Sequence, residues 1–218
     1  MLFKNRKEAG VKLAKKLSLY KDQAKGIVLA LPRGGVPVAY EVAQRLHLPL
    51  DVFIVRKLGV PGHQELAMGA IASNGVRVLN QELVQSFGIT PQEIERVTQI
   101  EKEELLRREK LYRGQRAFPD LQQHKVILID DGLATGSTML AALHAIREKN
   151  PQALMVAVPL ASPDVCNDFK KEVDDIVCLH TPEPFYAVGE WYEDFSQTTD
   201  EEVRELLEKS KRHSQNGN

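Results

Sequence analysis

The stretch VILIDDGLATGST, residues 126–138, decides the fold of this chain. Its four leading apolar residues predict a fully buried strand of a parallel sheet. Two carboxylates, Asp130 and Asp131, follow where that strand ends, and a short loop of small and hydroxylated residues comes next. Apolar residues then recur at helical spacing, so we expect a helix to begin near Ser137 or Thr138.

This strand, loop and helix start favour a ligand that carries both a phosphate and hydroxyl groups. The first backbone N–H groups of a helix lack internal partners and, with the helix dipole, attract a phosphate. Gly136 lets the backbone approach the anion, and hydroxyl donors flank it at Thr135, Ser137 and Thr138. The two carboxylates would repel a phosphate but suit sugar hydroxyls or a hydrated Mg²⁺. A ribose 5-phosphate with a charged substituent meets both requirements.

The stretch resembles the signature of the type I phosphoribosyltransferases, which bind 5-phosphoribosyl 1-pyrophosphate. The hydrophobic run, the acidic pair and the T-G-x-T pattern all occur in register. The resemblance implies that Asp130 and Asp131 bind the ribose 2′- and 3′-hydroxyls and, through water, a Mg²⁺ ion. It also implies a 5′-phosphate site in the following loop, formed by Ala134, Thr135, Gly136, Ser137 and Thr138.

An ordinary strand-to-helix turn capped by Ser137 is the alternative interpretation of this stretch. A cap alone does not require the adjacent acidic pair, so the alternative explains less. A Walker A loop is excluded because G-K-[ST] does not occur, and the dinucleotide fingerprint G-x-G-x-x-G is also absent.

The size and composition of the chain fit one α/β domain. It has 218 residues, 43% of them hydrophobic, and a net charge of −1. Because nothing is globally basic, we expect neither a nucleic acid nor a membrane as partner. Cys166, in an expected helix, and Cys178, in an expected core strand, fit no Cys-x-x-Cys pattern and are interpreted as buried, reduced thiols in a reducing compartment. With no apolar signal region or membrane span, we expect a cytoplasmic protein.

A second loop with anion-binding character follows the apolar strand at residues 27–31. Arg33 offers forked donors that suit a diphosphate, and Gly34 and Gly35 permit unusual dihedrals that expose backbone N–H groups. A simple glycine turn is the alternative. The resemblance implies that Arg33, Gly34 and Gly35 bind pyrophosphate, with a cis peptide bond at Arg33–Gly34 or Gly34–Gly35.

A third loop, RKLGVPGHQE at residues 56–65, follows the strand expected at 51–55. Its glycines and proline favour a loop that closes over a ligand, although a polar surface loop would look similar. The loop resembles the mobile catalytic loop of the family, except that Val60 replaces a lysine found in several members. The catalytic candidates are two cations for the leaving group and two acid/base groups for a nucleobase proton, namely Arg56, Lys57, His63 and Glu65.

Residues about 80–122 are interpreted as a helical insertion. Thr90-Pro91-Gln92-Glu93 forms a capping box that begins a long charged helix. The arginines that follow this helix, Arg113 and Arg116, are interpreted as ordinary loop residues in preference to pyrophosphate ligands. Before the insertion, Asn74-Gly75 predicts a hairpin turn between strands at 67–72 and 76–79.

Residues about 180–218 are interpreted as a small C-terminal hood. Aromatic residues gather at 185–195, and the resemblance implies that the hood covers an acceptor base, with Trp191 and Tyr192 as acceptor-binding residues. Packing of these aromatics onto the sheet is the alternative. Residues 213–218 are expected to form a loose tail.

Strands alternate with helices through much of the chain, which predicts a doubly wound, mainly parallel central sheet with flanking helices in one domain, residues 1–218. The resemblance implies a pentosyltransferase that moves ribose 5-phosphate from phosphoribosyl pyrophosphate to a nitrogen acceptor, a nucleobase in preference, with Mg-pyrophosphate leaving. The alternative is a non-catalytic module that senses phosphoribosyl pyrophosphate or a nucleotide. The sequence leaves open whether the acceptor is a purine, a pyrimidine or another amine, and whether the chain forms a homodimer.

Overall fold

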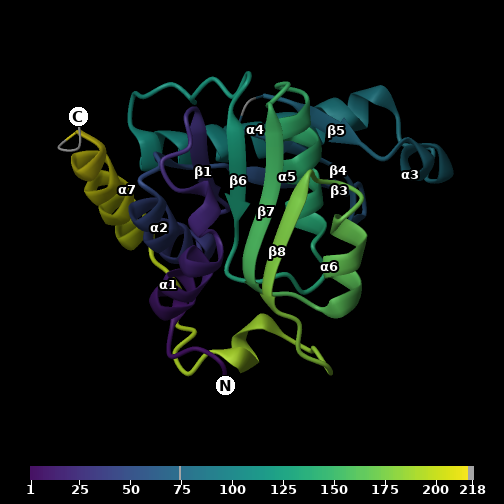
Figure 1. The fold of residues 1–218 in the computed structure, drawn as a ribbon. Coiled ribbons are helices and arrows are strands. Elements are labelled where there is room, and N and C mark those ends of the chain that lie inside the picture. Colours follow the sequence, from purple (N-terminus) through teal and green to yellow (C-terminus); the bar gives the residue numbers. More distant parts are fainter. Residues whose placement is uncertain (74, 216–218) are drawn as a thin grey trace.

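The computed structural model describes residues 1–73 and 75–215, with side chains as far as Arg212 (Figure 1). Its centre is a five-stranded parallel sheet in the order β2-β1-β6-β7-β8. The strands are β1 (Gly26–Ala30), β2 (Leu50–Val52), β6 (Lys125–Ile129), β7 (Ala153–Leu160) and β8 (Asp175–His180). The α/β class and the mainly parallel sheet predicted from the sequence are confirmed.

Helices cover both faces of this sheet, as its buried strands require (Figure 1). Alternate residues of β6 point to opposite faces, so Ile127 packs in one core and Leu128 in the other. The first core includes helices α1 (Arg6–Lys16), α2 (Gly35–Leu46) and α7 (Asp200–Gln215), and the second includes α5 (Ser137–Arg147) and α6 (Pro163–Phe169). A short 3₁₀ helix, η1 (Ser18–Tyr20), follows α1.

The predicted mobile loop at 56–65 is instead a β-hairpin. Its strands, β3 (Val55–Val60) and β4 (His63–Ala72), pair antiparallel, and β5 (Arg77–Leu79) completes a second, three-stranded sheet. Leu58 and Val60 alternate with less buried residues, Lys57 and Gly59, and are themselves buried, which gives the hairpin an apolar face. That alternation was present in the sequence, but the glycines and proline outweighed it.

The elements expected before and within the insertion are present. Strands β4 and β5 pair as predicted, although Asn74 of the expected turn lies outside the described residues. Helices α3 (Gln81–Ser86) and α4 (Pro91–Arg113) follow, and the capping box of Thr90 and Glu93 begins α4. At the other end of the chain, α7 extends to Gln215, so the expected tail is too long, and residues 216–218 lie outside the description.

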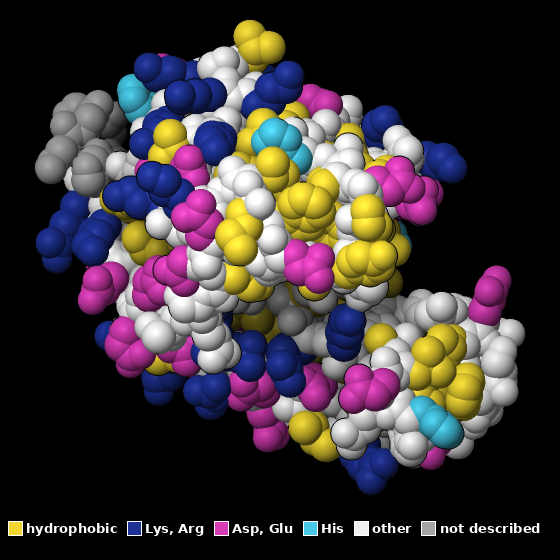
Figure 2. Space-filling view, turned by 90° about the horizontal axis from the view of Figure 1, so that it is seen from below, with side chains coloured by type: hydrophobic (Ala, Val, Ile, Leu, Met, Phe, Trp, Pro, Cys, Tyr) yellow, Lys and Arg dark blue, Asp and Glu magenta, His cyan; other side chains and the backbone are white. Residues whose placement is uncertain are grey.

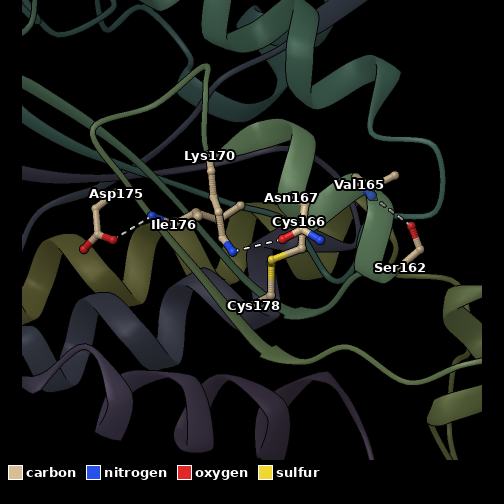
Figure 3. The surroundings of a disulfide bond; sticks show 8 residues. All are labelled: Ser162, Val165, Cys166, Asn167, Lys170, Asp175, Ile176 and Cys178. Carbon is tan, nitrogen blue, oxygen red and sulfur yellow. Dashed lines mark hydrogen bonds between the residues drawn. A yellow bond between two sulfur atoms is a disulfide. The ribbon is translucent and has the colours of Figure 1, made fainter.

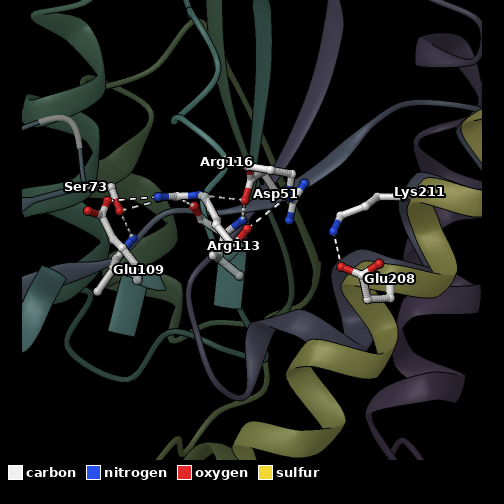
Figure 4. A network of polar contacts seen from close by, with 9 residues as sticks. Asp51, Ser73, Glu109, Arg113, Arg116, Glu208 and Lys211 are labelled. Carbon is white, nitrogen blue, oxygen red and sulfur yellow. Dashed lines mark hydrogen bonds and ion pairs between the residues drawn. The ribbon is translucent and has the colours of Figure 1, made fainter. Parts of the chain in front are cut away.

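Arg113 is not an ordinary loop arginine but the centre of a buried polar network (Figure 4). Its side chain is 2% exposed and lies 2.9 Å from the carboxylates of both Asp51 and Glu109. It also donates to the backbone carbonyl of Val52, and Ser73 Oγ lies 3.4 Å away. The network therefore joins α4 to β2 of the main sheet and to the β4–β5 connection. Arg116, which donates to the carbonyl of Arg113, lies at the edge of this network.

We expect Arg113→Ala to lower the free energy of unfolding by about 3–5 kcal/mol, because it leaves buried carboxylates without their cation. The matched control is Arg107→Ala, since Arg107 is 60% exposed and, among the described residues, forms its ion pair with Glu104 on its own helix. That change should leave the midpoint of urea unfolding close to that of the wild type. Equal losses in the two variants would contradict the central role of Arg113.

The cysteine interpretation is wrong, because the sulfur atoms of Cys166 and Cys178 are bonded (Figure 3). The residues lie, as expected, in a helix and a core strand, α6 and β8. Their Cα atoms are 6.5 Å apart, so the pairing is one that only the tertiary fold creates. The two cysteines therefore no longer indicate a reducing compartment. No helix in the described parts of the chain is long and apolar enough to cross a membrane.

Replacing both cysteines with serine should lower the free energy of unfolding by about 3 kcal/mol, because the bond closes a short loop of chain, with a sequence separation of 12. The measurement is urea unfolding of the wild type with and without a thiol reductant, beside the double variant. The reductant should shift the wild-type midpoint and leave the variant unchanged. If the reductant leaves the wild-type midpoint unchanged, the disulfide contributes nothing to the free energy of unfolding.

Candidate active site

The site is built where the strand order reverses. From β1 the chain proceeds to β2 on one side, whereas β6 leads to β7 and β8 on the other. Crevices outside the carboxyl ends of strands at such a switch point are the usual ligand sites of open α/β sheets. The amide of Leu31 donates to the carbonyl of Ile129, 2.9 Å away, so the loops after β1 and β6 leave the sheet together. Figure 2 looks onto this edge and shows a hollow with basic side chains along its rim.

Gly34 and Gly35 pack directly against the acidic pair. A Cβ atom on Gly34 would lie 2.1 Å from Oδ2 of Asp131, and one on Gly35 would lie 2.8 Å from the carbonyl oxygen of Ile129. Gly34 has ordinary helical dihedrals, φ −59° and ψ −34°. The sequence interpretation of unusual dihedrals is therefore wrong for Gly34. These positions need glycine for space.

The cis peptide bond of this loop is Pro32–Arg33, one bond before the earlier of the two predicted positions. Gly34 is already helical and Gly35 is the first residue of α2, so both predicted bonds lie at the helix start. The resemblance located the segment correctly and the bond wrongly.

The acidic pair is largely enclosed. Burial and the neighbouring Asp131 carboxylate raise the pKa of Asp130 well above its ordinary value. Burial also raises the pKa of Asp131, while the Arg6 guanidinium opposes that shift. Arg6 Nε lies 2.7 Å from Asp131 Oδ2. Sequence reasoning missed Arg6, because a single arginine at a helix start carries no pattern that connects it with a residue 125 positions away.

The loop after the acidic pair forms a hollow of about 170 Å³ lined by Asp130, residues 132–139 and Val188. Gly136 has φ +69°, the left-handed conformation that favours glycine, and a Cβ there would lie 2.6 Å from the Phe169 ring. Helix α5 begins at Ser137, as predicted, so its free N–H groups face this hollow. The loop therefore has the geometry of an anion site at a helix N-terminus.

Of the four catalytic candidates, Lys57 alone contacts the signature loop in the described structure. Its Nζ donates to Ser137 Oγ, 2.9 Å away, from strand β3. Arg56 is instead paired with Glu101 of α4 at 2.6 Å. His63 is exposed and packs edge-on against Phe87, with ring centroids 5.8 Å apart. Glu65 is exposed as well.

Arg33 is half-buried, and its guanidinium faces a carboxylate. Its Nη1 lies 3.7 Å from Oδ1 of Asp200, the first residue of α7. The Tyr112 hydroxyl donates to the same oxygen at 2.5 Å. A separation of 3.7 Å between half-buried side chains that still contact water is a weak ion pair, so Arg33 can exchange Asp200 for another anion at little cost.

The hood combines residues near the start of the chain with the segment before α7, although the sequence assigned it to residues 180–218 alone. The amides of Leu2 and Phe3 donate to the carbonyl of Trp191, and that of Glu193 donates to the carbonyl of Phe3. Figure 1 shows these segments side by side below the sheet. The hood also contains the short 3₁₀ helix η2 (Val188–Trp191).

The two acceptor candidates differ in what they offer a ligand. Tyr192 is 2% exposed, its ring lies between those of Phe3 and Phe195, and its hydroxyl donates to the carbonyl of Asp131 at 2.7 Å. This ring has no open face on which a base could stack, and the acceptor-binding role of Tyr192 stays a prediction. Its hydroxyl holds the backbone of the acidic pair. Trp191 stacks on Phe185, and its Nε1 is a buried donor with no partner among the described residues.

The described residues include no group of three or more acidic, histidine or cysteine side chains that could hold a metal ion. Asp130 and Asp131 are nevertheless suited to Mg²⁺. This ion retains several waters and is commonly bound by one or two carboxylates together with substrate phosphates. The pair therefore fits the water-mediated mode predicted from the sequence.

Comparisons with known proteins agree with this geometry. A family model described as "Phosphoribosyl transferase domain" matches residues 2–183. Two curated proteins of Mycobacterium tuberculosis, from strains CDC 1551 / Oshkosh and H37Rv, are 43% identical over 211 residues, and their names assign them provisionally to the phosphoribosyl transferases. The match covers 97% of this chain and 47% of theirs, so the chain spans about half the length of these relatives.

A solved structure is similar over nearly the whole chain. The crystal structure of TT1426 from Thermus thermophilus is 40% identical and superposes with a TM-score of 0.83. The alignment covers 95% of this chain and 98% of that one. The chain belongs to the phosphoribosyl transferase family, which confirms the resemblance first given by residues 126–138.

Gly34→Ala should weaken the binding of phosphoribosyl pyrophosphate by about tenfold or more, or about 1.4 kcal/mol, because the new methyl group would displace the Asp131 carboxylate. Calorimetric titration in the presence of Mg²⁺ measures this loss. Gly88→Ala is the matched control, since Gly88 has a positive φ of 59° and open space around it. It should cost stability without changing affinity. Equal affinity in wild type and Gly34→Ala would contradict the close contact.

Proposed function

We propose that this chain transfers the 5-phosphoribosyl group of phosphoribosyl pyrophosphate to a nitrogen acceptor, with pyrophosphate as the leaving group. The observation that carries the proposal is the convergence of three parts at one sheet edge. These are the acidic pair Asp130–Asp131, the anion loop 134–138 and the arginine loop 33–35. An oxygen-rich sugar with an anion at each end would satisfy all three.

In the proposed complex, the carboxylates of Asp130 and Asp131 accept hydrogen bonds from the ribose hydroxyls. The 5′-phosphate is bound by backbone N–H groups and hydroxyls from Ala134, Thr135, Gly136, Ser137 and Thr138. The diphosphate faces Arg33 and the backbone N–H groups around Gly34 and Gly35. Lys57 reaches the phosphate loop from the hairpin, where it adds a positive charge.

The chemistry requires no nucleophile from the protein. The acceptor nitrogen attacks C1′, the bond from C1′ to the diphosphate oxygen breaks, and its electrons leave with pyrophosphate. Positive charge develops on the sugar ring, as in glycoside hydrolysis. The residues bind and orient the sugar, and Arg33 stabilises the departing charge. Bound Mg²⁺ would further neutralise the diphosphate, with Asp130 and Asp131 holding it through water.

The proposal extends to the acceptor molecule and to the residue that takes its proton. We propose a nucleobase as acceptor under the hood, with His63 or Glu65 taking its proton, which requires the exposed tip of the hairpin, residues 62–65, to close over the site. The insertion at about 80–122 corresponds to α3 and α4. The cytoplasmic location and the homodimer stay predictions.

A second candidate function is ligand sensing without transfer. Two arginines predicted to face pyrophosphate are already paired with carboxylates, Arg56 with Glu101 and Arg33 with Asp200. A sensor would bind phosphoribosyl pyrophosphate through the acidic pair and the phosphate loop, and would release no pyrophosphate with any acceptor. Pyrophosphate release in the presence of purine and pyrimidine bases separates the two functions.

The test of ligand binding is calorimetric titration of phosphoribosyl pyrophosphate with Mg²⁺ into wild type and the double variant Asp130→Asn, Asp131→Asn. The substitution retains the volume of both side chains and removes two of the acceptor oxygens, so the fold should persist while binding is lost. Circular dichroism checks the fold. The proposal is overturned if the double variant binds as the wild type does, or if the wild type does not bind.

A further inference from the structure

Arg6, the first residue of α1, joins three separate parts of the site. Its Nε lies 2.7 Å from Oδ2 of Asp131, and its Nη1 donates to the backbone carbonyl of Ser196, also at 2.7 Å. The guanidinium carbon lies 3.9 Å from the centroid of the Phe195 ring. With these three contacts and a side chain that is 11% exposed, Arg6 is held in one orientation.

Arg6 and a backbone amide each hold one oxygen of the acidic pair. Arg6 takes Oδ2 of Asp131, and the Asp131 amide donates to Oδ1 of Asp130 at 2.8 Å. The oxygens outside these two bonds are Oδ1 of Asp131 and Oδ2 of Asp130, and the two neighbouring side chains also interact with each other. Each carboxylate therefore has one oxygen outside the bonds to Arg6 and the Asp131 amide, and a vicinal diol would need one acceptor from each.

Arg6 is also the only lysine or arginine within ion-pair distance of either carboxylate among the described residues. Two neighbouring, largely enclosed carboxylates repel one another, and a rotation of Asp131 about its side-chain torsions would relieve that repulsion. The charge-assisted bond from Arg6 opposes such a rotation. The Tyr192 hydroxyl fixes the backbone of Asp131 through its carbonyl.

We propose that Arg6 is a positioning residue for ribose recognition. By holding Oδ2 of Asp131, it presents Oδ1 to a hydroxyl of the sugar, and the same guanidinium fixes the hood segment 195–196 beside the ribose. The inference rests on the proposed binding of phosphoribosyl pyrophosphate. It adds a residue from outside the three predicted loops, and it gives the N-terminal helix a part in the specificity of the site.

The first test compares two ligands in calorimetry with the full chain and Mg²⁺. In Arg6→Ala, the affinity for phosphoribosyl pyrophosphate should fall about 10- to 100-fold, the usual loss for a hydrogen bond to a charged group. The affinity for inorganic pyrophosphate, which has no diol, should change less than about twofold. Arg6→Lys, which retains the charge without the fork, should recover part of the loss. Equal losses for the two ligands would show a general structural effect and overturn the proposal.

The matched control is Lys12→Ala on the same helix. Lys12 Nζ donates to the carbonyl of Leu2 and lies 5.1 Å from the Phe3 ring centroid, so it contacts the hood without touching Asp131. This variant should bind both ligands as the wild type does. A loss in Lys12→Ala as large as that in Arg6→Ala would assign the effect to the hood alone, against the proposal.

A double-mutant cycle tests whether Arg6 acts through Asp131. Arg6→Ala and Asp131→Asn should each weaken binding, and the double variant should be little weaker than the worse single variant. Additive losses would contradict action through Asp131. The outcomes also separate the two levels of the account. A wild type that binds no phosphoribosyl pyrophosphate refutes the proposed function, whereas a binding wild type with unaffected Arg6 variants refutes this inference alone.

Discussion

The close approach of two loops at the carboxyl ends of β1 and β6 is the constraint on which the rest of the structure depends. The contact leaves no room for a Cβ at Gly34, which lies against the Asp131 carboxylate, and little at Gly35. Parallel pairing of β1 with β6 brings the arginine loop and the acidic loop to the same edge. The strand order reverses between β1 and β6, so their loops lead to opposite sides of the sheet and form a crevice outside its edge.

The two adjacent, largely enclosed carboxylates repel one another, and a cation from a distant part of the chain offsets this repulsion. Burial raises the pKa of both Asp130 and Asp131, and Arg6 is the cation that favours the charged form of Asp131. Arg6 comes from the start of the first helix, while Phe195 and Ser196 beside it come from the C-terminal segment. The two ends of the described chain therefore close around the residues proposed to bind the sugar.

The structural features that could be predicted well from the sequence are those determined by residues close together in the chain. The stretch 126–138 contains a strand, an acidic tip, a glycine in the left-handed conformation and a helix start, each set by its neighbours in the chain. The capping box at Thr90 is local in the same sense. The parallel sheet followed from the alternation of such units.

The parts that sequence reasoning missed depend on residues far apart in the chain. The Cys166–Cys178 bond, the burial of Arg113 against Asp51 and the pairing of Arg6 with Asp131 arise only when separate elements meet. The loop predicted at 56–65, where β3 and β4 form a hairpin, was wrong for another reason. Turn residues and a buried alternation competed there, and packing of Leu58 and Val60 decided the outcome.

A crystal structure of the complex with phosphoribosyl pyrophosphate and Mg²⁺ tests the central claim most directly. The account predicts the 5′-phosphate in loop 134–138, the ribose hydroxyls on Asp130 Oδ2 and Asp131 Oδ1, and the diphosphate beside Arg33, with Arg6 still on Oδ2 of Asp131. A ligand bound elsewhere, for example in the groove of about 580 Å³ between Lys110 of α4 and Arg204 of α7, would contradict it.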